Sequence, residues 1–406
     1  MPKRSGDSGA AEAARVLVLS PEAPFPAIGG GALRSASLVH YFARRGPVDL
    51  ILFQQPGEAD PALAIPNEVQ GEKFVLRLSY HARHGAARIW RNAGRALRGV
   101  PPLVDRFRGF DREIAGTLTG RRYRLGVIEH FWCAPYLALL EAHCEEVWVD
   151  LHNVESVLQG REAELAAGPA RLGFRRFARA YEALERELLP RFGRVLVTSE
   201  EDAEAVKRLA PGARTTIFPN TIPLRPAPVR AEENAIAFSG NLAYQPNTEA
   251  VRYFAGQVWP LLRAKWPNLV WRIIGKNPAE IQRYVQAGEY IQVVGPVEDA
   301  IGELARVRVV VVPVLAGSGT RVKILEAWAA GAPVVSTTVG AEGLGARAGE
   351  HLLIADTPAQ FSETVSALLT SQGLRQQIGA GGRKFYEERF TWEVGWRLLD
   401  ETACVG

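Results

Sequence analysis

The segment VPVLAGSGTRVKILEAWAAGAPVVST, residues 312–337, is the most informative stretch of this chain. A β-branched strand at 307–312 ends at Pro313, and a loop of small residues follows. An apolar-periodic helix is predicted to begin near Ser318 or Thr320. Free backbone N–H groups at such a helix N-terminus can hold an anion. The segment therefore predicts a strand, loop and helix of a parallel α/β sheet, with an anion site where the strand ends.

Charged side chains follow this loop. Arg321 and Lys323 lie in the first helical turn, where cations oppose the helix macrodipole by about 0.3–1 kcal/mol each, so a bound polyanion explains their position. Lys323 and Glu326 share one helix face, whereas Val322 and Leu325 line another. Cations suit the phosphates of a nucleotide diphosphate, and a carboxylate can accept both hydroxyl protons of a ribose diol. We expect a nucleotide site here; the alternative is a solvated Lys–Glu pair on a surface helix.

The composition is that of a globular protein. The chain has 406 residues, of which 47% are hydrophobic and 23% charged, as expected for two or three domains. Because no run of about eighteen apolar residues occurs, no membrane-spanning helix is predicted. Residues 1–14 lack the apolar core of a signal peptide and are expected to be a flexible tail. The cysteines are odd in number and lack CxxC spacing, which argues against disulfides and a zinc site and favours the cytoplasm: Cys133, Cys144 and Cys404.

The net charge of +4 is unevenly distributed. Arginines are frequent between Arg77 and Arg124, and a second basic run begins at Arg171. We predict basic amphipathic helices at 83–98 and 171–186, a pattern typical of surfaces that bind anionic membranes or other polyanions. The alternative is a solvated or inter-domain face. Since no nucleic-acid-binding module accompanies the charge, we expect no nucleic-acid partner.

Strand and helix patterns alternate along the whole chain, which predicts parallel sheets covered by helices. We expect strands at residues 15–20, 48–53, 73–78, 125–128, 147–151, 194–198 and 215–218, and again at 235–239, 270–274, 290–294, 307–312, 333–336 and 352–354. A proline-rich linker at 220–234 separates a first domain (15–219) from a second (235–388), and a C-terminal helix at 389–406 is expected to brace the first domain. The predicted fold is two facing, Rossmann-like, doubly wound domains with an inter-domain cleft.

Several motifs resemble the family four glycosyltransferases of the GT-B fold, retaining enzymes that use nucleotide-sugar donors. In the second domain these are FSGNLAYQPN (238–247), WRIIGKNP (271–278), VVGPVED (293–299) and GAEGL (340–344), together with the segment quoted above. In the first domain they are PFPAIGGGALRS (24–35) and DLHNVES (150–156). The resemblance implies the GT-B fold and transfer of a sugar to an acceptor hydroxyl.

The first domain contributes five candidate residues. Gly30 and Gly31 lie in the glycine loop, where the backbone can approach phosphate or sugar closely. The third glycine of a dinucleotide-binding GxGxxG would fall at Arg34, which argues against a dehydrogenase. By resemblance, His152 lies beside the transferred sugar as a hydrogen-bond partner or weak base. Other candidates lie where a neighbouring strand ends and are expected on the acceptor side: Glu129 and His130.

The second domain contributes the predicted donor site. Gly240 and Asn241 resemble the family's phosphate-facing loop, and Val297 the position that meets the base. Glu326 matches the second of two paired glutamates, expected to hold the ribose. Ser318 replaces the first glutamate of that pair, and the family's usual arginine and lysine are absent from 241–247.

These departures shift the expected donor contacts to the 318–323 segment. Phosphate neutralisation is expected from Arg321 and Lys323, and sugar contacts from Ser318, Gly319 and Thr320. No Asp-x-Asp pair occurs, so we expect no metal. His152, Lys323 and Glu326 are the expected catalytic residues.

These patterns predict a metal-independent, retaining glycosyltransferase with no cofactor beyond its nucleotide-sugar substrate. The acceptor would be a saccharide or a lipid-linked molecule of bacterial polysaccharide or glycolipid synthesis. We expect a cytoplasmic protein, with peripheral attachment to the inner membrane face as the role of its basic helices. One alternative is a non-catalytic sugar-nucleotide-binding partner, motivated by the missing glutamate. Another is a nucleotide-sugar 2-epimerase, although the sequence reveals no cluster of carboxylates for such chemistry.

Overall fold

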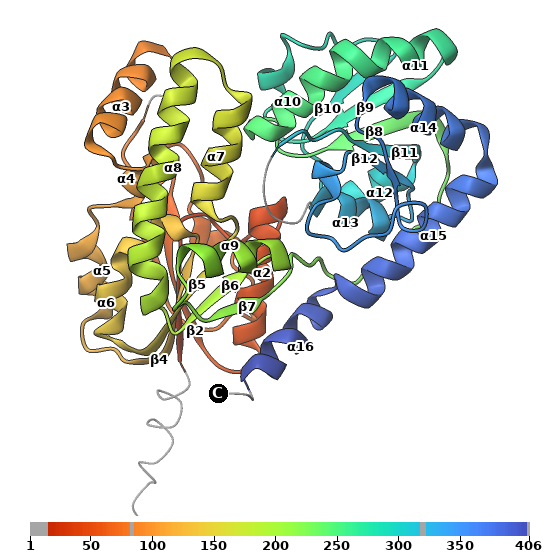
Figure 1. The fold of residues 1–406 in the computed structure, drawn as a ribbon. Helices are drawn as coiled ribbons and strands as arrows, with labels where there is room; N and C mark the ends of the chain where they lie inside the picture. The colour runs from red at the N-terminus through yellow and green to blue at the C-terminus, as the bar shows by residue number, and fades with distance from the viewer. Residues whose placement is uncertain (1–14, 82–84, 317–321, 404–406) are drawn as a thin grey trace, which may run out of the picture. The chain divides into compact units, whose positions relative to one another are not determined.

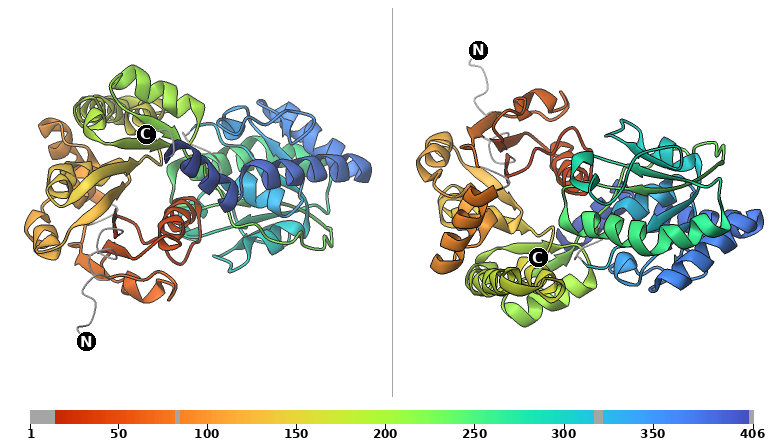
Figure 2. Two further views of the ribbon diagram at one scale, coloured as in Figure 1. Left: turned by 90° about the horizontal axis from the view of Figure 1, so that it is seen from below. Right: turned by 90° about the horizontal axis from the view of Figure 1, so that it is seen from above.

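The computed structural model describes residues 15–81, 85–316 and 322–403. They form two compact units, one comprising residues 15–218 with 399–403 and the other residues 219–398 (Figure 1). Each unit contains one parallel sheet with helices on both faces (Figure 2). Two Rossmann-like units therefore confirm the predicted fold class. Within the described ranges, no helix has the length and apolar character needed to cross a membrane.

The first unit contains a seven-stranded sheet of order β3-β2-β1-β4-β5-β6-β7. Its strands are β1 (Val16–Ser20), β2 (Val48–Gln54), β3 (Lys73–Arg77), β4 (Tyr123–Glu129), β5 (Cys144–Asp150), β6 (Arg194–Val197) and β7 (Thr215–Ile217). Strand β1 lies between β2 and β4, with Val18 opposite both Leu50 and Val127. All five residues of β1 are buried, as expected for a central strand covered on both faces.

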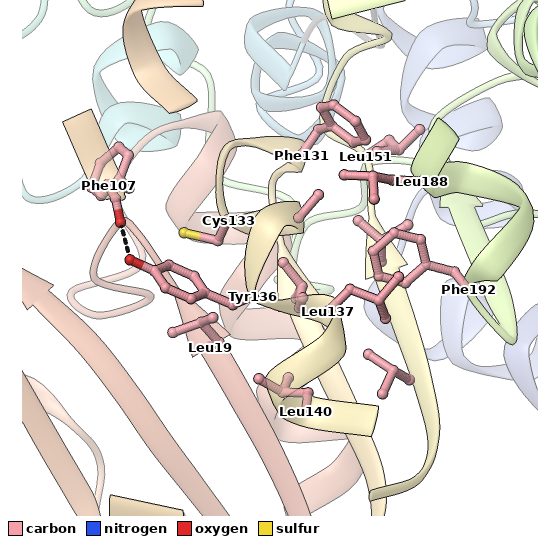
Figure 3. Close-up of a cluster of buried hydrophobic side chains, with 14 of the residues drawn as sticks. Leu19, Phe107, Phe131, Cys133, Tyr136, Leu137, Leu140, Leu151, Leu188 and Phe192 are labelled. Atoms are coloured by element: carbon pink, nitrogen blue, oxygen red, sulfur yellow. Dashed lines mark hydrogen bonds between the residues drawn. The ribbon is translucent and has the colours of Figure 1, made fainter. Parts of the chain in front are cut away.

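Helices pack this sheet into a core. They are α2 (Gly30–Ala43), α3 (Gly85–Arg98), α4 (Pro102–Phe107), α5 (Asp111–Leu118), α6 (Leu137–Glu141), α7 (Glu155–Leu165), α8 (Gly168–Leu188) and α9 (Glu200–Leu209). Figure 3 shows Leu137 and Leu140 of α6 among buried side chains from strands and other helices. The Tyr136 hydroxyl donates a hydrogen bond of 2.6 Å to the Phe107 carbonyl, so its polar atom is satisfied inside an otherwise apolar cluster.

The second unit contains a six-stranded sheet of order β10-β9-β8-β11-β12-β13. The strands are β8 (Glu233–Ser239), β9 (Val270–Ile274), β10 (Ile291–Val294), β11 (Val307–Val312), β12 (Val334–Ser336) and β13 (Leu353–Ile354). The helices are α10 (Gln245–Tyr253), α11 (Trp259–Lys265), α12 (Ala300–Ala305), α13 (Val322–Ala329), α14 (Pro358–Thr370), α15 (Gln372–Arg389) and α16 (Trp392–Ala403). Trp328 of α13 is fully buried and its indole N–H donates 2.8 Å to the His351 carbonyl, which anchors the helix.

Every predicted strand is present, with boundaries shifted by no more than a few residues. The largest differences are in β4 and β5, which begin at Tyr123 and Cys144 because backbone pairing continues past the apolar run. Glu145 and Glu146 are exposed although they lie in β5. Hydrophobic patterning could not detect this part of the strand, since it reports burial rather than pairing.

The ends of the second unit contain ordered segments. Arg230, within the predicted linker, donates to the carbonyls of Gly331 and Val307 at 2.6 Å each. The neighbouring Glu232 pairs with Arg375 at 2.8 Å, so this stretch packs on the second unit ahead of β8. At the other end of the unit, α16 leads the chain back to the first unit at residue 399.

The sheet orders define one switch point in each unit. In the first unit the chain leaves β1 toward β2 on one side and later returns to β4 on the other, so the loops after β1 and β4 diverge. In the second unit β8 and β11 have the same relation. Open α/β sheets bind ligands at the carboxyl ends of strands at such points. The loops after Ser20, Glu129, Ser239 and Val312 are therefore where ligand-binding side chains are expected.

Candidate functional site

The switch point of the first unit contains a buried polar cluster. Glu129 is the last residue of β4, Asp150 the last of β5, and His152 follows two positions later. The His152 Nε2 atom lies 2.9 Å from Glu129 Oε2 and 3.3 Å from Asp150 Oδ2. Because neighbouring parallel strands end at the same edge, two acids and a histidine meet at one place. This corrects the expectation that the chain has no cluster of carboxylates.

Helix α2 supplies the partners of these carboxylates. The Arg34 Nε atom donates to both Asp150 oxygens, at 3.0 and 2.8 Å, and its guanidinium also donates 2.5 Å to the Phe218 carbonyl. The Ser35 hydroxyl donates 2.8 Å to Glu129 Oε2. In the sequence, Arg34 stands out only as the residue in the place of the third glycine of GxGxxG. An arginine in an otherwise apolar, small-residue helix start was the available signal, since such a residue must find an acid when buried.

The pKa values of the three ionisable side chains in the cluster shift in different directions. Burial alone would raise the pKa of Asp150, but the Arg34 guanidinium lowers it to about 2. Burial would lower the pKa of His152, but hydrogen bonds to Asp150 and Glu129 raise it to about 9. Burial and the nearby Asp150 charge raise the pKa of Glu129. The raised pKa favours the protonated form of His152 at neutral pH, in which the imidazolium lies between the two carboxylates.

The donor atoms of Glu129, Asp150 and His152 lie within 4.8 Å of one another, a spacing that would also suit a metal ion. Arg34 and Ser35, however, already donate to the two carboxylates. A protonated imidazole cannot ligate a metal through the same nitrogen. The bonding present favours an internal ion-pair network at this place.

His130 stacks beside this network. Its backbone has φ of 61°, and its ring lies 3.6 Å from the His152 ring and 4.1 Å from the Trp132 ring, centroid to centroid. Burial, aided by the nearby His152 charge, lowers the pKa of His130 well below its usual value. Neither ring nitrogen hydrogen bonds to any described residue. Both ring nitrogens are buried, and Nε2 lies 3.7 Å from Glu22 Oε2, so this neutral imidazole packs against the network rather than facing solvent.

The glycine loop approaches the same cluster. Gly30 is the first residue of α2, and a Cβ added at Gly31 would lie 3.0 Å from Glu22 Oε2 and 3.7 Å from His152 Nδ1. Gly29 has φ of 93°, a conformation that favours glycine. The loop thus brings the backbone beside His152, and its contact with a sugar or phosphate stays a prediction.

The switch point of the second unit holds a lysine against a strand end. Lys323 Nζ donates 2.5 Å to Asn247 Oδ1 and lies 4.3 Å from the centroid of the Phe238 ring. A Cβ added at Gly240, directly after β8, would lie 3.1 Å from Lys323 Nζ and 2.8 Å from Asn247 Nδ2. A side chain at position 240 would displace the ends of the Asn247 and Lys323 side chains. The motifs predict Gly240 and Lys323 as site residues but not Asn247, which positions the lysine.

Glu326 lies three residues after Lys323 on α13. Both are partly exposed, whereas Val322 and Leu325 are buried, so the predicted division of helix faces is confirmed. Burial raises the pKa of Glu326 to about 7, against the opposing effect of the Lys323 charge. Among the described residues, none hydrogen bonds to the Glu326 carboxylate. The other predicted donor contacts lie outside the described residues: Ser318, Gly319, Thr320 and Arg321.

Asn241 and Val297 occupy different parts of the second unit. Asn241 shapes the loop after β8, because its Oδ1 accepts from Ala243 N at 3.1 Å and from Asn277 Nδ2 at 2.9 Å. Val297 is partly buried in the loop after β10, two strands from β8 in the sheet. The structure thus brings Gly240 and Lys323 into one site and places Val297 farther along the same sheet edge.

Sequence comparisons match the second unit and, more weakly, the whole chain. A family model described as Glycosyl transferases group 1 matches residues 233–371. The chain is 22% identical over 404 residues to an uncharacterized 44.6 kDa protein in the cps region of Klebsiella pneumoniae, with 93% of this chain and 96% of that protein covered. It is 33% identical over 129 residues to a phosphatidyl-myo-inositol mannosyltransferase of Mycobacterium leprae, covering 30% of this chain and 34% of that protein.

Solved structures match both units. Sucrose-phosphate synthase from Thermosynechococcus elongatus has a TM-score of 0.74 at 16% identity, covering 96% of this chain and 98% of that chain. Anabaena HepE, in complex with UDP and glucose, has a TM-score of 0.66 at 14% identity, covering 96% of this chain and 99% of that chain. At these identities the likeness establishes a shared fold.

Proposed function

We propose that this chain, a group 1 glycosyltransferase with the GT-B fold, transfers a sugar from a nucleotide-sugar donor to an acceptor hydroxyl. The transfer is proposed to retain the configuration of the sugar. The observation that carries the proposal is the Lys323 ammonium held against Gly240 where β8 ends. A cation beside exposed backbone at a switch point is suited to the phosphates of a departing nucleotide diphosphate.

Each candidate residue has a separate role in this proposal. Lys323 binds the diphosphate, and Glu326 accepts hydrogen bonds from the ribose diol. His152, protonated by its carboxylate partners, donates a hydrogen bond to the transferred sugar. Stabilisation of the leaving group by fixed charges makes catalysis mainly electrostatic, with no metal required. Glu129 and His130 are buried, so the role proposed for them on the acceptor side is to position His152.

The acceptor is proposed to belong to polysaccharide or glycolipid synthesis. Two relatives support this: one from a cps region, and one named as acting on phosphatidyl-myo-inositol. The HepE complexes contain UDP and glucose or UDP-glucose, which makes UDP-sugars the first donors to test.

The proposal is tested by thermal stabilisation with a panel of nucleotide sugars, followed by release of nucleotide with and without candidate acceptors. A binding donor raises the unfolding temperature by mass action. Nucleotide release that depends on an acceptor identifies a transferase. A binding-only partner would release none, and an epimerase would change the donor sugar without any acceptor.

We predict that Glu326→Gln weakens donor binding and removes its pH dependence near pH 7. With a pKa of about 7, the native side chain is a carboxylate above that pH and becomes protonated below it. Native affinity for the donor should therefore fall as the pH drops below 7, by up to about tenfold per unit. The measurement is titration calorimetry with the nucleotide sugar that gives thermal stabilisation in the panel. The phosphates of a nucleotide sugar keep their charge around pH 7, so they add no pH dependence of their own. Glu363→Gln, at an exposed position of α14, is the control. A variant with native affinity and pH dependence would refute the ribose assignment.

We predict that His152→Gln lowers turnover on the order of 100-fold while leaving affinity for free nucleotide diphosphate nearly unchanged. Glutamine can still donate a hydrogen bond to Glu129 but lacks the positive charge. Steady-state kinetics and calorimetry on the same preparation separate the two effects. His143→Gln, at a partly buried position next to β5, serves as the matched control. Equal losses of nucleotide affinity and turnover would place His152 elsewhere in the mechanism.

A further inference from the structure

Helix α3 presents its apolar face to solvent. Ile89, Trp90 and Leu97 are 70%, 77% and 80% exposed. Ala86 and Ala93 are exposed on the same stripe, since all five positions fall within one arc of the helical wheel. An apolar stripe on a surface helix normally faces the core. Its outward orientation indicates that something apolar covers it.

Arginines hold the opposite face and the C-terminal end of α3 to the rest of the first unit. Arg95 is 4% exposed, and its Nε atom donates 2.7 Å to Asp105 Oδ2. From α8, which lies beside α3 in Figure 1, the Arg176 guanidinium donates 3.2 Å to the Leu97 carbonyl and also donates to the Ala96 carbonyl. These contacts fix the rotation of α3 about its axis. The exposure of its apolar side chains is therefore a property of the folded state.

The surroundings of the stripe are strongly basic. Helix α3 contains no acidic residue, and the first acid of α8 is Glu182. On α8, Leu172 is 69% exposed and lies on the same helix face as three exposed arginines, at i+3, i+4 and i+7: Arg175, Arg176 and Arg179. The surface thus combines large apolar side chains with a rim of fixed positive charge. We call it the α3–α8 surface.

We propose that the α3–α8 surface docks on an anionic phospholipid bilayer, with α3 lying in the plane of the interface. Its apolar side chains would enter the boundary between headgroups and acyl chains, as in other interfacial helices. The arginine rim would contact the phosphate headgroups. A second copy of the chain is a poorer occupant, because a two-fold contact through this face would bring two identical arginine rims together. This inference does not depend on sugar transfer.

Flotation of the full chain with vesicles tests the proposal. Vesicles of phosphatidylcholine, with and without phosphatidylglycerol, are compared at low and high salt. One variant, called the ridge variant, replaces two large apolar side chains of the α3 stripe (Ile89→Ser with Trp90→Ser). The other, called the rim variant, reverses the charge of two arginines of the rim (Arg175→Glu with Arg179→Glu). The matched controls change one exposed apolar residue and one exposed arginine elsewhere in the first unit: Leu63→Ser and Arg208→Glu.

We expect the native chain to float with anionic vesicles at low salt and to be released at high salt. The ridge variant should lose about tenfold or more in vesicle affinity. The rim variant should lose about 25-fold or more, at a factor of about five for each arginine. Controls should float like the native chain, and circular dichroism should confirm that all variants fold. Equal binding to neutral vesicles, no binding to anionic ones, or native-like binding by the variants would overturn the proposal. So would a dimer, detected by sedimentation, that only the ridge variant abolishes.

Discussion

Replacing Arg34 by methionine is expected to destabilise the first unit by about 3–5 kcal/mol, because it removes the bidentate partner of the buried Asp150 carboxylate and leaves it only His152. Methionine keeps much of the volume of the arginine stem, so a cavity is not the main effect. The Phe218 carbonyl also loses its donor. Urea unfolding followed by circular dichroism measures the loss. Arg45→Met is the matched control, since its ion pair with Asp400 at 2.5 Å is about half exposed on each side and should cost less than about 1 kcal/mol.

The pH dependence of this variant provides a second measurement. In the native chain the pKa of Asp150 is lowered, so its contribution to stability is present above the unfolded-state pKa and is lost as the pH falls toward 2. Without Arg34, burial raises that pKa, and the sign reverses: acidification below about pH 5 should recover part of the lost stability. Adding Asp150→Asn to Arg34→Met removes the uncompensated charge and should also recover stability. A loss below about 1 kcal/mol in the single variant would show that the pair contributes little.

Lys323→Ala is expected to weaken nucleotide-diphosphate binding by about 1.5–3 kcal/mol, the range for a hydrogen bond to a charged group. The Lys323 ammonium donates a hydrogen bond to Asn247 and lies over the Phe238 ring, close to Gly240. Truncation removes the cation from the end of β8. The fold should persist, because Asn247 keeps its 2.8 Å bond to the Asn241 carbonyl.

Calorimetry with UDP, GDP and ADP is the measurement for Lys323→Ala. The matched control is Lys265→Ala, which removes an exposed lysine near the end of α11. Native affinity for all three nucleotides would show that Lys323 is a surface charge and would leave the proposed donor site without its principal cation.

The two candidate sites differed in how far they could be predicted. In the second unit, Gly240, Lys323 and Glu326 were identified from motifs, because a strand end and the following helix start place their residues in a regular way. Asn247 was missed, since its role depends on the turn from β8 into α10. In the first unit, His152 and Glu129 were identified separately as residues that follow strands. The hydrogen-bonded cluster that they form with Asp150 and Arg34 was not predicted.

Local sequence patterns predict the parallel strands, their approximate boundaries and the division into two Rossmann-like units, because burial of a covered parallel strand requires a local run of apolar residues. Which polar residues meet, and in which direction their pKa values shift, depends on contacts that form only in the folded chain. Arg34 and Asp150 are far apart in the sequence, and no local pattern links them. The protonation of His152 follows from two carboxylates that reach it from neighbouring strands. The exposure of the apolar face of α3 is also a property of the tertiary structure. The sequence pattern predicts an amphipathic helix, but the contacts of Arg95 and Arg176 determine which of its faces meets solvent.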